Sequence, residues 1–545
     1  MCDDAGEQNT AAKCVDAHLR SKDILSLRKH DVQHSINRVL QGLDVELQQA
    51  TEGTLLFPVP VLLQRISKLC KLHPSVKVFI LQSRVRVVWA LLAKECEQAI
   101  VKQDELSIPQ LTSAQASLGL YCATFWEQLA SMRFWFHDSM TAVITLHSYA
   151  TLYNCNVAPQ PSQDLERVFL AGIAHHIDAL SALGLSNACW ALSKLQISGL
   201  DALWPQVQLT VAQLCQVPGK LSPEDVACIA YALGDAKKPL GCAQEPFLRA
   251  VQETSRRMNA KQVSRTMRGI ASMGLNPGKA HNHLMRVVEQ QVCCEVVSTN
   301  QMPYLVITIT AFADSKLPVG RVHEALMSTL HSNMHRMNPA FIAATVSACG
   351  KMYQVGSAHQ ELIEPLRSPL EDAVKASADR MDAKAVSNTV TGLARMNSTL
   401  GAARDPLSRA IVREAGLLVP WRLSGMFMAY AMMQREFGER QGEVTSAMRA
   451  ALQAPVAWGD VSSRGIGEVF WAVGMLRMDP GARTTRRLLD AAGMWGAVGM
   501  SVYDAERVMV GLSWLQRLGF PGSDIAKQVS SVMEEMQGIV DSAGD

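Results

Sequence analysis

Few residues of this chain have the types and spacing that catalysis or metal binding requires. His331 and His335 are four residues apart on an expected helix, a spacing that can hold a metal ion, but no glutamate follows His331 and no third ligand is evident. The run Gly493-x-x-Gly496-x-x-Gly499 lacks the preceding strand and the glycine spacing of a dinucleotide-binding loop. The sequence therefore predicts no catalytic residues, no metal site and no cofactor, and we do not expect an enzyme.

A different chemistry is indicated by residues suited to single-stranded RNA, which needs polar groups for base edges, planar groups for stacking and cations for phosphates. Such residues occupy three positions of a helix that recurs along the chain, and they vary from copy to copy. Basic side chains outnumber acidic ones there by six to three. The alternative is that an exposed helix face is variable and charged in any protein, with its tryptophans packed on neighbours. The predicted RNA-binding residues are Asn187, Trp190, Lys194, Arg265, Arg268, Lys351, Asn388, Arg395 and Arg507.

The element that must position these residues is a repeat of roughly 40 residues. A triplet of a small, a hydrophobic and a small residue recurs with spacings of 37 to 44 residues. With the first small residue as position 0, positions −6 and −2 are apolar in every copy, and together with +1 and +4 they form one stripe of a helix. Positions −4, −1 and +3 lie opposite this stripe, and the small residues flank it, where they should let neighbouring helices approach closely. The triplets begin at residues 148, 191, 232, 269, 311, 348, 392, 429, 472 and 511.

Helix start and stop signals divide each repeat into two helices. Start signals such as Ser222-Pro223-Glu224 and Asn338-Pro339-Ala340 precede the triplet helix, since Ser and Asn cap a first turn and Pro suits its opening position. A Gly- or Pro-bearing break and a second amphipathic segment follow. Stacked units of this kind bury a core that none could bury alone. The predicted fold is an all-α solenoid of about ten degenerate helical-hairpin repeats, with a disordered tail over 1–30, diverged repeats or an N-terminal cap over 31–135, and the repeat array over 136–540.

Composition agrees with one long helical array and limits the possible partners. Hydrophobic residues make up 48% of the chain and charged residues 19%, and unbranched apolar side chains, which favour helices, are plentiful. A net charge of +2 argues against a protein that holds nucleic acid by phosphate neutralisation alone. The 13 cysteines contain no C-x-x-C pair, which is typical of free thiols in a reducing compartment. No apolar run approaches the ~20 residues that cross a bilayer, so no membrane association is expected.

The best copy of the repeat, Asn187-Ala188-Cys189-Trp190-Ala191-Leu192-Ser193-Lys194-Leu195, resembles the core of octotricopeptide repeats and the related repeats of FAST-kinase-like mitochondrial proteins. The copies at 387–396 and 470–476 keep parts of the pattern, and the resemblance covers residues 140–540 by register. It implies an organellar RNA-binding protein of the mitochondrion or chloroplast. Its role would lie in RNA processing, stability or translation, with single-stranded RNA as partner, or in an organelle ribosome with ribosomal RNA as partner. The Asn at position −4 is kept in only two copies, so a simple modular base code is not expected.

The competing interpretation is a protein-interaction scaffold of armadillo or HEAT character that binds no RNA and is cytoplasmic. The near-neutral charge favours it, as do the apolar, Met-rich exposed positions between 425 and 475, which suit a protein partner. The start Met1-Cys2-Asp3-Asp4 is acidic and unlike an organelle presequence. An apolar groove formed by Met428, Met432 and Met475 would favour the scaffold. A single basic strip would favour RNA, and it would be formed by Arg265, Arg268, Lys351 and Arg395.

Overall fold

The computed structural model describes residues 85–542 with short gaps, and before them residues 43, 45–52, 59, 62, 63 and 66. The predicted tail over 1–30 lies outside the described residues. Every regular element of the described part is helical, and no helix in it is long and apolar enough to span a membrane. The gaps are residues 103–106, 132–135, 137, 156, 198, 218, 294–296, 316–319, 455–457, 459–460 and 519–523.

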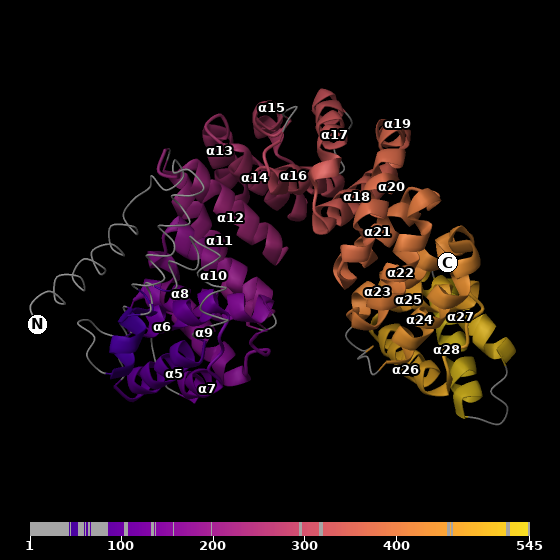
Figure 1. The fold of residues 1–545 in the computed structure, drawn as a ribbon, viewed down its shortest axis with the longest axis horizontal. Coiled ribbons are helices and arrows are strands. Elements are labelled where there is room, and N and C mark those ends of the chain that lie inside the picture. Colours follow the sequence, from indigo (N-terminus) through magenta and orange to yellow (C-terminus); the bar gives the residue numbers. More distant parts are fainter. Residues whose placement is uncertain are drawn as a thin grey trace, which may run out of the picture. The chain divides into compact units, whose positions relative to one another are not determined.

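Within each unit the helices alternate along the chain between two layers, which confirms the predicted solenoid of helical hairpins. In the second half of the chain, α15, α17 and α19 lie on one side and α14, α16 and α18 on the other (Figure 1). The first layer comprises α6 (Ser107–Leu118), α8 (Ser139–Asn154), α10 (Ala182–Leu195), α12 (Pro223–Ala236), α14 (Ala260–Ser272), α16 (Met302–Ser315), α18 (Pro339–Tyr353), α21 (Ala383–Arg395), α23 (Pro420–Met433), α25 (Ser463–Met475) and α27 (Val502–Leu518). The second layer comprises α5 (Val85–Lys102), α7 (Ala123–Ser131), α9 (Gln163–His176), α11 (Leu200–Gln216), α13 (Gln244–Ser255), α15 (His281–Gln291), α17 (Arg321–Asn333), α19 (Ser357–Ile363), α20 (Arg367–Ser377), α22 (Arg404–Glu414), α24 (Gln441–Gln453), α26 (Ala482–Val498) and α28 (Asp524–Asp541).

The chain divides into two compact units, unit 1 ending at Thr254 and unit 2 beginning at Ser255. In unit 1, α6, α8, α10 and α12 pack in that order, each on the next. In unit 2, α14, α16, α18, α21, α23, α25 and α27 do the same. The triplets on either side of the boundary begin at 232 and 269, an ordinary spacing. The triplet spacing therefore does not change at the boundary between the units. This is why the sequence predicts a single array over 136–540.

The predicted start signals act as helix caps. The Ser222 hydroxyl accepts a hydrogen bond from the Asp225 N–H at 3.2 Å, and the Asp225 carboxylate accepts one from the Ser222 N–H at 2.9 Å, which completes a capping box at α12. At α18, the Asn338 side chain accepts from the Phe341 N–H at 2.9 Å. Each cap satisfies backbone donors that the first helical turn leaves unpaired.

The small residues of the triplets bring neighbouring first-layer helices into backbone contact. A Cβ atom on Gly392 would lie 2.5 Å from the Val346 carbonyl oxygen, and one on Gly350 would lie 2.6 Å from that of Gly392. Between α25 and α27, a Cβ on Gly511 would lie 2.3 Å from the Phe470 carbonyl oxygen. Side chains at these positions would collide with backbone, so the predicted close approach is confirmed.

Candidate functional site

Unit 2 contains a groove of about 1040 Å³ along its first layer. Every first-layer helix of the unit, from α14 to α27, contributes to its lining, and about half of the lining residues stand at positions −4, −1 and +3 of the repeat. It gathers five of the nine residues that the sequence predicts for RNA contact. These are Arg268, Lys351, Asn388, Arg395 and Arg507.

Three of the other four predicted residues, Asn187, Trp190 and Lys194, lie in unit 1. Asn187 lines a separate pocket of about 400 Å³ between the first-layer helices of that unit. The Trp190 ring is half-buried and packs on the His147 ring, with 4.9 Å between the centroids. Arg265 is half-buried in unit 2 and does not line the groove.

Carboxylates of neighbouring repeats neutralise three of the predicted cations. Lys194 pairs with Asp235, with 2.6 Å between nitrogen and oxygen. Asp314 on α16 pairs with two residues of the groove, Arg268 on α14 and Lys351 on α18, the latter at 2.7 Å. The α14–α18 end of the groove is therefore basic in composition but largely paired in charge.

Three arginines at the other end of the groove have no carboxylate within ion-pair distance among the described residues. Arg395 on α21 makes neither a hydrogen bond nor an ion pair there; burial, then the nearby Arg464 guanidinium, lowers its pKa. Burial likewise lowers the pKa of Arg422 on α23, which donates weakly to the Asn388 side-chain oxygen at 3.4 Å. Arg507 on α27 is 9% exposed, and its Nη1 has no hydrogen-bond partner. No carboxylate in the described part of the chain therefore pairs with the positive charges of these three side chains.

Two exposed aromatic rings line the same end of the groove, each with an arginine stacked on it. The Arg422 guanidinium carbon lies 4.1 Å from the Trp421 ring centroid, and that of Arg507 lies 4.1 Å from the Tyr503 ring centroid. Arg507 also donates to the Tyr503 hydroxyl at 2.7 Å. Trp421 is 59% exposed and Tyr503 62%. The free faces of these rings are available for stacking.

Sequence reasoning missed four groove residues because they lie one helical turn before the positions considered. Trp421, Arg464 and Tyr503 occupy position −8 of their repeats, and Arg422 occupies −7. Position −8 precedes −4 by four residues and therefore lies on the same helix face. Extending the exposed stripe by one turn toward the helix start would have found them.

Acidic and apolar side chains limit the charge of the groove. Glu468 is buried and accepts from the Arg464 Nε at 3.0 Å, and Asp504 is held by the Ser501 hydroxyl at 2.8 Å. Met428 and Met432 also line the groove, whereas Met475 is exposed outside it. Each expected signature is therefore present only in part: the groove has Arg268, Lys351 and Arg395 but not Arg265, and Met428 and Met432 but not Met475.

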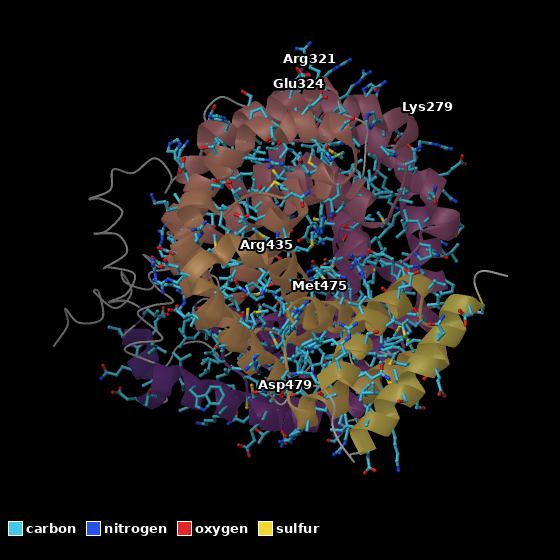
Figure 2. All side chains as sticks on the ribbon, turned by 90° about the vertical axis from the view of Figure 1, so that its right-hand side faces the viewer. Lys279, Arg321, Glu324, Arg435, Met475 and Asp479 are labelled. Carbon is cyan, nitrogen blue, oxygen red and sulfur yellow. The ribbon has the colours of Figure 1, made fainter. Side chains whose placement is uncertain are left out.

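Charged side chains of the second-layer helix α17 do not line the groove. Figure 2 shows Arg321 and Glu324 projecting outward from α17, and Arg321 pairs with Glu289 at 2.9 Å. Among the described residues, no three His, Cys, Asp or Glu side chains are grouped so as to hold a metal ion.

Comparison with known proteins gives no family. No family model matches the chain, and no curated protein matches it. It is similar to a chain of a homology model of the full-length AP-3 complex in an intermediate open conformation, at 12% identity and a TM-score of 0.30, over 99% of this chain and 97% of that one. It is also similar to the crystal structure of She4p, at 9% identity and a TM-score of 0.33, over 97% of this chain and 78% of that one. Similarity at this level does not indicate a function.

Proposed function

We propose that the protein binds single-stranded RNA in the groove of unit 2. The observation that carries this proposal is that Arg395, Arg422 and Arg507, which pair with no carboxylate among the described residues, line one groove with the exposed rings of Trp421 and Tyr503. Single-stranded nucleic acid is bound by this pairing of cations for the backbone with aromatic faces for the bases.

Base stacking and phosphate binding would fall to different side chains of the groove. Bases stack on the free faces of Trp421 and Tyr503, while the guanidiniums behind and beside the rings donate to phosphate oxygens. Asn388 and Thr391 on α21 offer hydrogen-bonding groups to base edges. A duplex presents no free base faces, so the proposal requires a single strand.

The cellular role follows from the repeat rather than from the groove. The resemblance of the best copies to octotricopeptide repeats supports work on organellar transcripts, in processing, stability or translation, or as a subunit of an organelle ribosome. A mitochondrial or plastid location belongs to the same proposal.

A protein-binding scaffold is the second candidate, and two observations favour it. Met428 and Met432 give the groove an apolar stretch, and Asp314 removes the positive charge of Arg268 and Lys351 from one end. An apolar peptide with acidic residues would fit such a surface.

Crosslinking in cells followed by sequencing of bound RNA separates the two candidates. A discrete transcript footprint supports the RNA proposal, ribosomal RNA alone indicates a particle subunit, and no crosslink above background leaves the scaffold. In vitro, the double change Trp421→Ala and Tyr503→Ala should weaken binding of a single-stranded oligonucleotide by about 1–3 kcal/mol for each base that loses its stack.

The matched control is Trp190→Ala, which removes a half-buried tryptophan of unit 1. It should leave oligonucleotide affinity unchanged in the same gel-shift titration. Equal losses from both variants would contradict a groove-based site, and circular dichroism shows whether the helices are retained.

A further inference from the structure

A glycine lines the groove at a position where helix packing does not require one. Gly425 stands at repeat position −4 on α23. A Cβ atom there would lie 3.9 Å from Oε2 of Glu468 on α25, an ordinary contact, and would meet no other described atom of a neighbouring helix within 4 Å. A Cβ atom at Gly350, Gly392 or Gly511, by contrast, would collide with backbone. Alanine favours a helix more than glycine does, so packing does not explain Gly425, and its effect is an open space in the lining.

The Glu468 carboxylate faces this open space with one oxygen that accepts nothing. Glu468 is 8% exposed. Its Oε1 accepts from the Arg464 Nε at 3.0 Å, whereas its Oε2, the atom nearest to Gly425, accepts no hydrogen bond from the described residues. Burying a carboxylate oxygen without a donor costs free energy, which an N–H group of a ligand would recover. This oxygen is therefore suited to a ligand that donates hydrogen bonds.

An arginine without an ion-pair partner comes from the other side of α23. Arg395 on α21 lines the groove and makes no hydrogen bond or ion pair with the described residues. Burial, then Arg464, lowers its pKa, and the Glu468 carboxylate acts in the opposite direction. Because α23 packs between α21 and α25, this arginine and this carboxylate attract each other across α23 without forming an ion pair.

Trp421 adds a flat surface to the same part of the groove. It stands four residues before Gly425, so the two residues share one face of α23, one turn apart. The ring is 59% exposed, with the Arg422 guanidinium stacked on it. A base stacked on this ring would reach over Gly425, with the carboxylate of Glu468 on one side.

We propose that this part of the groove binds a guanine base of single-stranded RNA, an inference that rests on the proposed function. Guanine donates from its adjacent N1–H and N2–H groups, and a carboxylate can accept both. Its O6 and N7 atoms accept from an arginine, the commonest specific contact to guanine. Glu468 takes the donor edge of the base and Arg395 the acceptor edge, while the ring stacks on Trp421.

The other three bases fit this site less well. Adenine and cytosine each present an acceptor nitrogen beside their amino group, so a lone pair would face the Glu468 carboxylate. Uracil has an N–H group between two carbonyl oxygens, and these would also face it. A site built around a buried acceptor rejects ligands that leave the acceptor unpaired. The groove should therefore prefer guanine to adenine at one position of the strand.

The test measures binding of the full-length wild-type protein to oligouridylates that carry one central guanosine, adenosine or inosine, by fluorescence anisotropy. We expect the guanosine strand to bind about tenfold more tightly than the adenosine strand. Inosine keeps N1–H but lacks the amino group, so the affinity of its strand should lie between the two. If all three strands bind equally, the guanine site is wrong and the RNA proposal is unaffected. If none of them binds, both proposals fail.

Glu468→Gln assigns the preference to the carboxylate. Glutamine keeps an oxygen for Arg464 but places an amide donor where Oε2 accepts, so the guanosine and adenosine strands should bind equally. The matched control is Glu443→Gln on α24, since Glu443 lies outside the groove and pairs with Arg440 at 2.9 Å. This control should keep the tenfold ratio. A ratio that survives Glu468→Gln, or that Glu443→Gln also removes, would overturn the assignment.

Gly425→Leu tests the open space itself. Leucine favours the helix and fills the space over α23, so the ratio of the two affinities should fall to near one while circular dichroism shows retained helices. An unchanged ratio would mean that the base does not lie over Gly425. Because the wild-type protein and the three strands give the main result, misfolding of a variant does not protect the proposal from failure.

Discussion

The same repeat builds a charged groove in unit 2 and an uncharged pocket in unit 1. Six basic side chains and two acidic ones line the groove. The pocket of unit 1 is lined by serines, small apolar residues, Met140, Leu183, His147 and Asn187, with no Lys, Arg, Asp or Glu. Both lie between first-layer helices, and in both units the positions that pack into the core are apolar and small.

The difference between the two linings shows which positions of a repeat determine the fold and which determine the function. Core positions are constrained by neighbouring helices, so they keep their character in every copy. Positions facing away from the core meet no such constraint, and their chemistry differs between units. A function must therefore be inferred from the face of one unit rather than from the repeat as a whole.

The largest effect is expected from removing the unpaired charge of unit 2. Changing Arg395, Arg422 and Arg507 together to Ala should lower affinity for a single-stranded oligonucleotide by about 100-fold, from roughly 1 kcal/mol for each arginine–phosphate contact. The dependence of affinity on salt should become shallower as well. Fluorescence anisotropy at two salt concentrations measures both. Unchanged affinity would place the RNA site outside the groove, and the difference in charge between the two units would then have no bearing on RNA binding.

A smaller effect is expected from Gly392→Ala, which changes the stability of unit 2 and leaves the charged and aromatic side chains of the groove in place. Gly392→Ala places a methyl group against the Val346 carbonyl and should destabilise unit 2 by about 1–3 kcal/mol. Gly442→Ala in α24 meets no atom within 4 Å and should be neutral or stabilising by up to about 1 kcal/mol. Urea denaturation compares the two, and a neutral Gly392→Ala would show that backbone contact is not what sets the repeat stacking.

The smallest effect should come from Asp314→Asn. This change releases Arg268 and Lys351 from their shared carboxylate, so the α14–α18 end of the groove would gain free cations. Oligonucleotide affinity should rise about threefold, on the assumption that no more than one additional phosphate contact forms. A loss of affinity, measured in the same anisotropy titration, would mean that Asp314 positions these cations for the ligand rather than neutralising them.

The fold could be predicted from the sequence because its signals are local and repeated. The apolar stripe at −6, −2 and +1, the caps at Ser222 and Asn338 and the small residues at Gly350 and Gly392 each act within one helix or between adjacent helices. The boundary at Ser255 could not be predicted, since the triplet spacing runs through it unchanged.

The site could be predicted only in part because pairing between repeats is not local. Asp314 and Lys351 occupy the same repeat position, +3, in adjacent copies, and nothing in either copy alone indicates that one neutralises the other. Arg507, expected to face outward, is buried against the Tyr503 ring. Five of the nine predicted residues still line one groove, because position within the repeat determines the face.

The glycine contacts have a consequence for how this protein can evolve. Where backbone touches backbone, the spacing of helices is independent of side-chain size, so substitutions along the groove do not alter its width at Gly350, Gly392 and Gly511. Natural variation can then exchange one ligand chemistry for another without rebuilding the scaffold. In an alignment of relatives, glycine should persist at these sites while the groove residues drift.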